Sequence, residues 1–309
     1  MRRLPASGLL ALALVLPAVA GDAPIPGREG LNALLWMQTA QEYAFSTLQV
    51  YAQATRALGQ AAGLPSALVD PDLPDPGSGA PPAIVLDLDE TVLATSRYGA
   101  DLTAAGRRHA ETAWEEWVGR APAEALAGAL DFLHAAKAGG YRLFYVTNRG
   151  CPERERPAVY PHPACPQRDA TLAQARRLGL PGADDPKAFL FRGDQAGWES
   201  GDKSPRRRFL AAGQRVVMLL GDDLGDFLPR AELQALRASR AADRPVASAV
   251  SAAPAWAGRF GRQWFLLPNP SYGSWETALA PPCGPEDAAC AAGRLESKYR
   301  RLIPTPPGE

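Results

Sequence analysis

The chain has 309 residues, 46% of them hydrophobic, so it is long enough to bury a large core, and disorder along its whole length is excluded. Basic and acidic residues both number 33, which gives a formal net charge of zero. A strongly basic surface for binding a nucleic-acid polymer is therefore not predicted.

The N-terminus has the pattern of a secretory signal peptide. Arg2 and Arg3 precede an apolar run over 9–16, and an Ala-Val-Ala tripeptide ends at Ala20, which predicts a signal peptide at 1–20 with cleavage after Ala20. An uncleaved anchor is the alternative, but the apolar run is too short to span a bilayer, so no membrane span is predicted. Loss of two arginines leaves 33 − 2 = 31 basic and 33 acidic residues, a net charge of −2. We expect an exported protein, periplasmic or secreted.

The next residues predict helical elements around a first strand. Apolar side chains at helical spacing predict one amphipathic helix over 31–58, within an N-terminal helical segment at 21–78. Pro, Gly and Asp are frequent in 65–82, which is typical of a linker. The apolar run 83–86 predicts a buried strand. After it, the segment 94–120 is predicted to be an insertion that packs with the N-terminal helix as a small α-helical cap.

The remaining chain alternates predicted helices and strands. A helix is expected to begin at Pro122 and to end at Gly139-Gly140. The further segments are a strand at 143–146, helices at 169–178 and 205–212, and strands at 188–191, 216–220 and 264–267. Such alternation predicts an α/β fold, a Rossmann-like parallel sheet flanked by helices, with the core at 79–93 and 121–281. The C-terminal tail, 282–309, is expected to be a loop.

Two carboxylates stand directly after the first predicted strand. Asp87 and Asp89 are one residue apart, so strand alternation directs both side chains to the same side. The carboxyl ends of strands are where open α/β sheets bind ligands. One carboxylate could attack a substrate while the other transfers protons. Taken alone, however, this pattern is more often an acidic turn.

Three downstream segments add polar groups at other predicted strand or helix ends. The strand at 143–146 leads to Thr147 and Asn148, a hydroxyl and an amide suited to phosphate oxygens. Lys203 stands at the head of a predicted helix, where a lysine is usually solvated. A third buried strand opens into three aspartates, Asp222, Asp223 and Asp226.

In this order, D-x-D-x-T, T-N, K and G-D-x-x-x-D resemble the motifs of the haloacid dehalogenase superfamily of phosphohydrolases. From about 34 to 280 the chain is similar to the bacterial class C acid phosphatases, which include the outer-membrane lipoprotein 5′-nucleotidases. The markers are Trp36-Met37-Gln38 with Glu42-Tyr43, Trp114-Glu115-Glu116-Trp117-Val118, Phe144-Tyr145-Val146-Thr147-Asn148-Arg149 and Leu267-Pro268-Asn269-Pro270-Ser271-Tyr272-Gly273-Ser274-Trp275-Glu276. The chain departs from the family in having Ala94-Thr95 for Asp-Asn and Asp223 for Asn, and it has no cysteine near the cleavage site for a lipid anchor.

The resemblance implies a magnesium site. Asp87 and Asp222 would bind Mg²⁺ through carboxylates and Asp89 through its backbone carbonyl, while Asp226 would support these ligands. Asp223 has two interpretations: it supports the ligands together with Asp226, or it is solvated. Clustered carboxylates need such a cation, since two charges about 4 Å apart repel by about 4 kcal/mol at an effective dielectric constant of about 20. Mg²⁺ prefers oxygen ligands and completes its octahedron with water and substrate phosphate.

The resemblance also implies a reaction. Asp87 would attack phosphorus and form an aspartyl-phosphate, and Asp89 would act as the acid and then the base. Thr147, Asn148 and Lys203 would hold the transferred phosphoryl group. The implied protein is an Mg²⁺-dependent acid phosphatase that hydrolyses phosphomonoesters, in particular nucleoside 5′-monophosphates.

Alternatives remain at this point. They are a broad-specificity phosphatase or phosphotransferase, a 2-haloacid dehalogenase, and an envelope binding protein without turnover. The three histidines match no motif of the family, which argues against a histidine-nucleophile phosphatase. The oligomeric state is open, a homodimer included.

Aromatic side chains are the candidates for binding the leaving group. Tyr98, Trp114 and Tyr272 are expected at the mouth of the site, where a nucleobase could stack on them. Trp117 and Trp275 are candidates too, with a place in the core of the cap as an equal alternative.

Four cysteines in an exported chain predict disulfides, and three pairings are possible. We favour the two local pairs, Cys151–Cys165 and Cys283–Cys290. Metal binding by these thiols is a weaker alternative, because their spacings do not fit a zinc site.

Overall fold

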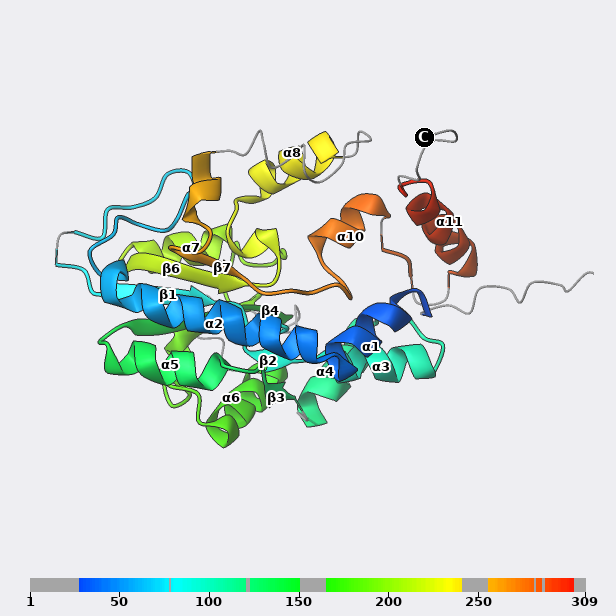
Figure 1. Ribbon diagram of the computed structural model, residues 1–309, viewed down its shortest axis with the longest axis horizontal. Helices are drawn as coiled ribbons and strands as arrows, with labels where there is room; N and C mark the ends of the chain where they lie inside the picture. Colours follow the sequence, from blue (N-terminus) through cyan, green and yellow to red (C-terminus); the bar gives the residue numbers. More distant parts are fainter. Residues whose placement is uncertain are drawn as a thin grey trace, which may run out of the picture.

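A parallel β-sheet forms the centre of the computed structural model, which describes residues 28–77, 79–120, 123–150, 165–240, 255–280, 282–284 and 287–302. The strand order is β5-β4-β1-β6-β7, and every neighbouring pair is parallel. The strands are β1 (Pro82–Leu86), β4 (Arg142–Gly150), β5 (Phe189–Arg192), β6 (Arg215–Gly221) and β7 (Trp264–Leu266). Helices lie on both faces of the sheet (Figure 1). The predicted α/β fold is confirmed.

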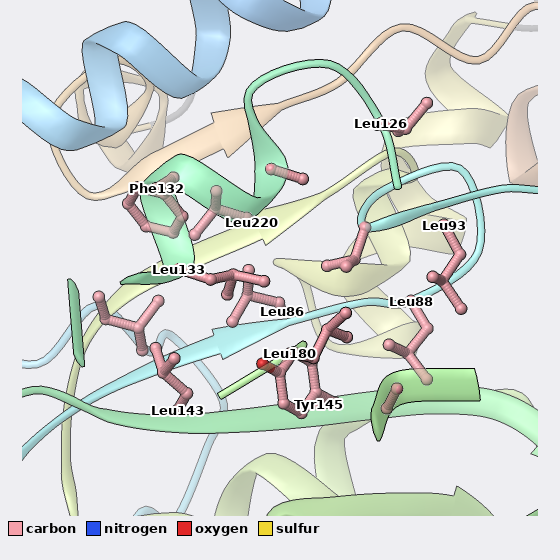
Figure 2. Packing of buried hydrophobic residues seen from close by; sticks show 14 of the residues in the cluster. Leu86, Leu88, Leu93, Leu126, Phe132, Leu133, Leu143, Tyr145, Leu180 and Leu220 are labelled. Atoms are coloured by element: carbon pink, nitrogen blue, oxygen red, sulfur yellow. The ribbon is translucent and has the colours of Figure 1, made fainter. Parts of the chain in front are cut away.

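Successive residues of each strand enter opposite cores, which is why the strands are apolar throughout. On β1, Ile84 and Leu86 belong to one buried cluster, while Ala83 and Val85 belong to the other. The first cluster is covered by α2 (Gln41–Ala61), α5 (Ala129–Ala138) and α6 (Pro166–Leu178). Figure 2 shows its centre, where side chains of α5 meet those of β1, β4 and β6. The second is covered by α7 (Ser204–Ala211) and α8 (Arg230–Arg240).

The N-terminal helix is broken into two. The structure has a 3₁₀ turn η1 (Arg28–Gly30), then α1 (Leu31–Thr39), and Ala40 is extended at φ −82° and ψ 129° before α2 begins. The prediction of one continuous helix was therefore wrong. The break lets α1 pack on α3 (Ser96–Ala104) while α2 packs on α5 (Figure 1).

Two short strands bracket the segment between β1 and the next core helix. The antiparallel pair is β2 (Leu93–Ala94) and β3 (Glu124–Ala125), and α3 and α4 (Glu111–Arg120) lie between its strands. The domain boundaries inferred from the sequence stay a prediction.

The next core helix, α5, starts later than predicted. Pro122 lies outside the described residues, and the chain forms β3 before α5 begins at Ala129. Gly128 caps the helix at φ 85°, and a Cβ there would lie 3.1 Å from the Cβ of Tyr51 on α2. A residue that tolerates positive φ and brings α5 close to α2 sets the helix start. The helix ends before Gly139, as predicted.

The segment predicted as a linker packs on the sheet. The backbone N–H of Ala67 donates to the carbonyl of Val216 at 2.7 Å, and Ala67 accepts a hydrogen bond from Trp264 Nε1 at 2.8 Å. Ala67, Leu68 and Asp70 are buried. Proline and glycine content indicated an irregular backbone correctly, but it did not reveal this burial.

The tail forms a helix, contrary to prediction. Helix α11 (Ala288–Tyr299) is capped by Asp287, which accepts a hydrogen bond from the backbone of Cys290 at 2.8 Å. The Cys283–Cys290 disulfide is confirmed. Cys165 is buried, and its predicted partner Cys151 lies outside the described residues.

The other elements are the 3₁₀ turns η2 (Pro186–Ala188), η3 (Leu224–Asp226) and η4 (Ala255–Arg259), and the short helix α10 (Ser274–Leu279). Among the described residues, no helix combines the length and apolar character needed to cross a bilayer.

Candidate active site

Three carboxylates converge at the carboxyl edge of the sheet. Asp87 follows β1, Asp222 follows β6, and Asp226 closes η3; one oxygen from each lies within 4.8 Å of the other two. Asp222 accepts hydrogen bonds from Thr91 Oγ1 at 3.1 Å and from Asn269 Nδ2 at 2.8 Å. The crossovers of a parallel sheet bring these groups together from distant parts of the chain.

Lys203 lies between two of these carboxylates. It precedes α7, its side chain is 7% exposed, and its Nζ donates to Asp87 Oδ1 and, at 2.5 Å, to Asp226 Oδ1. Burial alone would lower the pKa of Lys203, but the carboxylates of Asp226 and Asp87 outweigh it and raise the pKa. The lysine is therefore a fixed cation at neutral pH.

The carboxylates stay in excess of the nearby cation. Burial raises the pKa of Asp87, and Lys203 offsets only part of this effect. Burial, together with the neighbouring Asp87 and Asp226, raises the pKa of Asp222. A site of this kind gains stability from a further positive charge.

The donor set fits a hard divalent cation. Asp87, Asp222 and Asp226 offer carboxylate oxygens, the ligand type that Mg²⁺ and Ca²⁺ prefer. The resemblance assigned Asp226 a supporting place, whereas its carboxylate lies in the cluster itself. No histidine or cysteine belongs to this cluster among the residues that the structure describes.

Asp89 lies beside the cluster and faces an arginine. Arg149 donates from Nη2 to Asp89 Oδ1 at 2.7 Å and from Nε to both carboxylate oxygens at 3.1 Å. The side chain of Arg149 is fully buried, and that of Asp89 is 15% exposed. The sequence interpretation assigned Arg149 no role.

Thr147 and Asn148 lie in the last part of β4, next to a second buried arginine. Arg206 donates to the carbonyl oxygen of Thr147 at 2.5 Å and to Asn148 Oδ1 at 2.6 Å. The amide of Asn148 also donates to the carbonyl of Gly201 at 3.1 Å. Burial lowers the pKa of Arg206 to about 10, so this arginine keeps its charge at neutral pH. Asn148 keeps a second Nδ2–H and Thr147 keeps a hydroxyl hydrogen, so both side chains still have a hydrogen to donate.

A third arginine, Arg207, stabilises the loop that follows β6 and carries Asp226. Arg207 forms a fully buried, bidentate ion pair with Asp70, at 2.7 Å for both contacts. It also donates to the carbonyl oxygens of Gly225, Asp226 and Leu228 at 3.0 Å. The irregular segment before β1 therefore reaches the site through Asp70.

Asp223 has a structural task away from the carboxylate cluster. Its Oδ1 accepts from the backbone N–H of Gly225 at 2.7 Å and its Oδ2 from that of Ser274 at 2.6 Å. An asparagine would offer a single oxygen, so the departure from the family pattern suits this pair of donors. It ties η3 to the start of α10.

Glu90 holds the turn that joins Asp89 to β2 and α3. This buried residue has a φ of 55°, and its carboxylate accepts from Tyr43 Oη at 3.0 Å and from Thr95 N and Oγ1 at 2.6 and 2.8 Å. Tyr51 donates to the carbonyl of Thr91 at 2.5 Å. Thr95, the second departure from the family pattern, thus has a partner in the same turn.

The predicted aromatic residues lie in two groups. Tyr98 and Trp114 pack with Trp117, which stacks on Trp114 at a centroid distance of 5.3 Å and is 2% exposed. Tyr272 is 43% exposed, and its backbone N–H donates to Asn269 Oδ1 at 3.4 Å. Trp275 is partly buried and donates from Nε1 to the carbonyl of Tyr272 at 3.1 Å. Trp117 is thereby core, whereas Tyr272 has free surface.

Comparison with known proteins agrees with this arrangement. The sequence model of the family described as "HAD superfamily, subfamily IIIB (Acid phosphatase)" matches residues 29–275. The chain belongs to this family. Two solved structures of the class C acid phosphatase from Bacillus anthracis, one with tungstate bound, are each 28% identical in sequence to this chain. The tungstate-bound structure has a TM-score of 0.67 and the match covers 91% of this chain and 99% of that one; the other has a TM-score of 0.65 with coverages of 90% and 98%.

The phosphatase is therefore a phosphomonoester hydrolase, as the sequence predicted. Sequence reasoning missed the residues that hold its site, because buried arginines are rare and a basic helix start is usually solvated. Two signals were available. Arg149 directly follows Thr147-Asn148, and Arg206-Arg207 stand in the first turn of α7, where cations oppose the helix dipole and so need other partners.

Proposed function

We propose that the phosphatase is an exported, Mg²⁺-dependent enzyme that hydrolyses nucleoside 5′-monophosphates through an aspartyl-phosphate. The observation that carries the proposal is the meeting of Asp87, Asp222 and Asp226 with Lys203 at one sheet edge. Phosphoryl transfer needs this kind of positioning and charge neutralisation more than it needs covalent chemistry.

In the first half of the reaction, a carboxylate oxygen of Asp87 forms a bond to phosphorus as the ester P–O bond breaks. Asp89 gives its proton to the leaving alkoxide, so a neutral alcohol departs. In the second half, Asp89 takes a proton from water, the water oxygen attacks phosphorus, and the bond to Asp87 breaks. Thr147, Asn148 and Lys203 hold the equatorial oxygens, and Arg206 and Gly201 keep the side chain of Asn148 in place.

Asp87, Asp222 and Asp226 are the groups that would hold the Mg²⁺ ion, with the carbonyl of Asp89 as a further oxygen ligand. When bound, the ion neutralises charge on the phosphoryl oxygens and on the nucleophile. The described residues supply oxygen donors, the ligand type that such an ion prefers.

The nucleotide preference rests on Tyr272. Tyr272 is 43% exposed, and Asn269 links its backbone to Asp222, so it lies on a segment fixed to the same sheet edge as the carboxylates. Stacking on an aromatic ring contributes about 1–3 kcal/mol per base and discriminates little among bases. Export to the periplasm or medium rests on the pattern at 1–20, which lies outside the described residues.

A panel of phosphomonoesters on the purified mature protein tests these points. It should contain nucleoside 5′-monophosphates, a small aliphatic phosphate and an aryl phosphate, each assayed with and without a chelator. We expect kcat/KM to be highest for nucleotides, to vanish in chelator and to return with Mg²⁺. Full activity after exhaustive chelation would contradict the metal requirement, and equal kcat/KM across the panel would reduce the function to a broad-specificity phosphatase.

Replacing Tyr272 with alanine isolates the stacking contribution. The variant should raise KM for a nucleotide about tenfold, about 1.4 kcal/mol, with little change for a small aryl phosphate. Tyr299→Ala is the matched control, since Tyr299 is an exposed ring of α11, 60% accessible. The pH optimum should be acidic, as the family of acid phosphatases implies.

A further inference from the structure

Arg149 contacts the proposed acid–base group in a geometry that fixes its orientation. A guanidinium that donates from two nitrogens to one carboxylate defines the plane of that carboxylate as well as its distance. Here Nη2 and Nε of Arg149 both donate to Asp89, at 2.7 and 3.1 Å. Because the arginine side chain is fully buried, it cannot follow Asp89 into solvent.

The other side of Arg149 is fastened to the core. Nη1 donates to Thr171 Oγ1 at 2.9 Å and to Gln174 Oε1 at 3.5 Å, both on α6. Thr171 is itself held, since its hydroxyl donates to the carbonyl of Gln167 at 2.5 Å. The backbone N–H of Arg149 donates to Thr147 Oγ1 at 3.1 Å. The guanidinium is therefore held by α6 and β4, and it fixes the Asp89 carboxylate relative to these two elements.

The cap contacts the same guanidinium. The centre of the Arg149 guanidinium lies 5.7 Å from the centroid of the Trp114 ring, within the range of a cation–π contact. Trp114 in turn packs on Trp117 and Tyr98. The two sides of Arg149 that are not used by Asp89 are thus occupied by α6 and by an aromatic cluster of α3 and α4.

We infer that Arg149 is a positioning residue that aims the Asp89 carboxyl group at the leaving-group oxygen, an inference that rests on the acid–base role proposed for Asp89. Proton transfer needs a heavy-atom distance of about 2.6–3.2 Å, so a carboxyl group that rotates freely loses much of its effect. The substrates whose hydrolysis depends on this orientation of Asp89 are phosphate esters with poor leaving groups. Alkyl phosphates, including the 5′-phosphates of nucleosides, must have the departing oxygen protonated, whereas an activated aryl phosphate departs with little help.

The test compares two leaving groups in the same variants. Wild type, Arg149→Lys and Arg149→Met are assayed for kcat/KM with a nucleoside 5′-monophosphate and with p-nitrophenyl phosphate. The ratio kcat/KM is used because it covers the steps up to the first irreversible one, here the transfer to Asp87, and excludes the later hydrolysis. For Arg149→Met we expect a loss of at least 100-fold with the nucleotide and less than 10-fold with the aryl ester. Arg149→Lys keeps the positive charge but cannot donate from two nitrogens to one carboxylate. Its loss of kcat/KM with the nucleotide should lie between those of the wild type and Arg149→Met.

Two variants guard against a general effect on the fold. Thr171→Val removes one hydroxyl that holds Arg149 while leaving Asp89 untouched, and it should give a smaller loss of the same leaving-group dependence. Arg192→Met is the matched control, because Arg192 ends β5 in an ion pair with Glu111 at 3.1 Å and should show no such dependence. If Arg149→Met does not fold, Arg149→Lys and Thr171→Val carry the comparison.

Asp89→Asn distinguishes the positioning role of Arg149 from the acid–base role of Asp89 on which it rests. If Asp89→Asn loses activity equally on both substrates, the acid role of Asp89 fails. If Asp89→Asn is selective against the nucleotide but the Arg149 variants lose activity equally on both substrates, Arg149 only supports the fold and the positioning role is overturned. Matching selectivity in Asp89→Asn, Arg149→Met and Thr171→Val supports it.

Discussion

A single methyl group at Gly221 should disturb the carboxylate cluster. Gly221 is the last residue of β6, directly before Asp222, and a Cβ built there would overlap the side chain of Asp226, well inside van der Waals contact. Asp226 cannot yield freely, because its carboxylate is bonded to Lys203 at 2.5 Å and accepts the backbone N–H of Asp223 at 3.0 Å. Gly221→Ala is therefore expected to push Asp226 away from Lys203 and from the ion that the cluster would bind.

The magnitude follows from overpacking a buried site. Inserting a methyl group where no space exists costs about 1–3 kcal/mol. For a domain of this size class, each kcal/mol lowers the melting temperature by about 2–4 °C, so we expect a fall of about 2–12 °C. The displaced ligand should in addition raise the Mg²⁺ concentration needed for half-maximal activity by at least tenfold.

Scanning calorimetry and a Mg²⁺ titration of activity measure the two effects separately. Gly59→Ala is the matched control, because Gly59 is an exposed residue of α2 with no neighbouring atom within 4 Å of its Cβ position. There the same substitution should stabilise the helix by about 0.5–1 kcal/mol and leave the metal requirement unchanged. A Gly221→Ala enzyme with the wild-type melting temperature and Mg²⁺ requirement would refute the packing argument.

Three further substitutions test the proposed nucleophile and two contacts that stabilise the site. Asp87→Asn should abolish turnover without unfolding the protein, and more than a few per cent of residual activity would rule out the covalent route; in the wild type, a hydroxylamine-labile phosphoryl adduct should be trapped. Asp223→Asn replaces one acceptor by an amide that meets the N–H of Ser274, so it should lower stability by about 1–3 kcal/mol and raise KM for nucleotides; unchanged thermal unfolding would show that this contact contributes nothing. Tyr43→Phe leaves one hydrogen-bonding site of the buried Glu90 empty, and we expect a loss of about 1–2 kcal/mol in the free energy of unfolding, measured by urea titration against Tyr299→Phe as the exposed control.

The chemistry of the site could be predicted because it is concentrated at strand ends. An apolar run followed by Asp87 or Asp222 indicates both a buried strand and a polar edge, and the parallel topology brings such edges together. The groups that hold this edge in place could not be predicted in the same way. In the sequence, Arg206 and Arg207 look like part of a solvated helix face, although both are buried. Their burial depends on which segments pack on the helix, and the local sequence pattern does not contain that information.

Element boundaries were wrong where tertiary contacts override local preference. Ala40 has a good helical residue type, yet the chain extends there so that α1 and α2 can pack on different partners. Pro122 suggested a helix start, but Gly128, at positive φ and in close contact with Tyr51, determines where α5 begins. Helix α11 was missed because the tail was interpreted as a loop, and none of the helix residues is buried in the core.

The placement of β1 between β4 and β6 decides when the enzyme becomes competent during folding. Asp87 emerges early in synthesis, yet the pair of Thr91 and Asp222 that belongs to the same site spans 131 positions of chain. At about 5–20 residues per second, a ribosome needs about 7–26 s to make that stretch, and pairings of such long range also fold slowly. A nascent chain therefore carries Asp87, the proposed nucleophile, long before it has the other groups of the site. Recovery of phosphatase activity after denaturation should accordingly lag behind the return of helical circular dichroism.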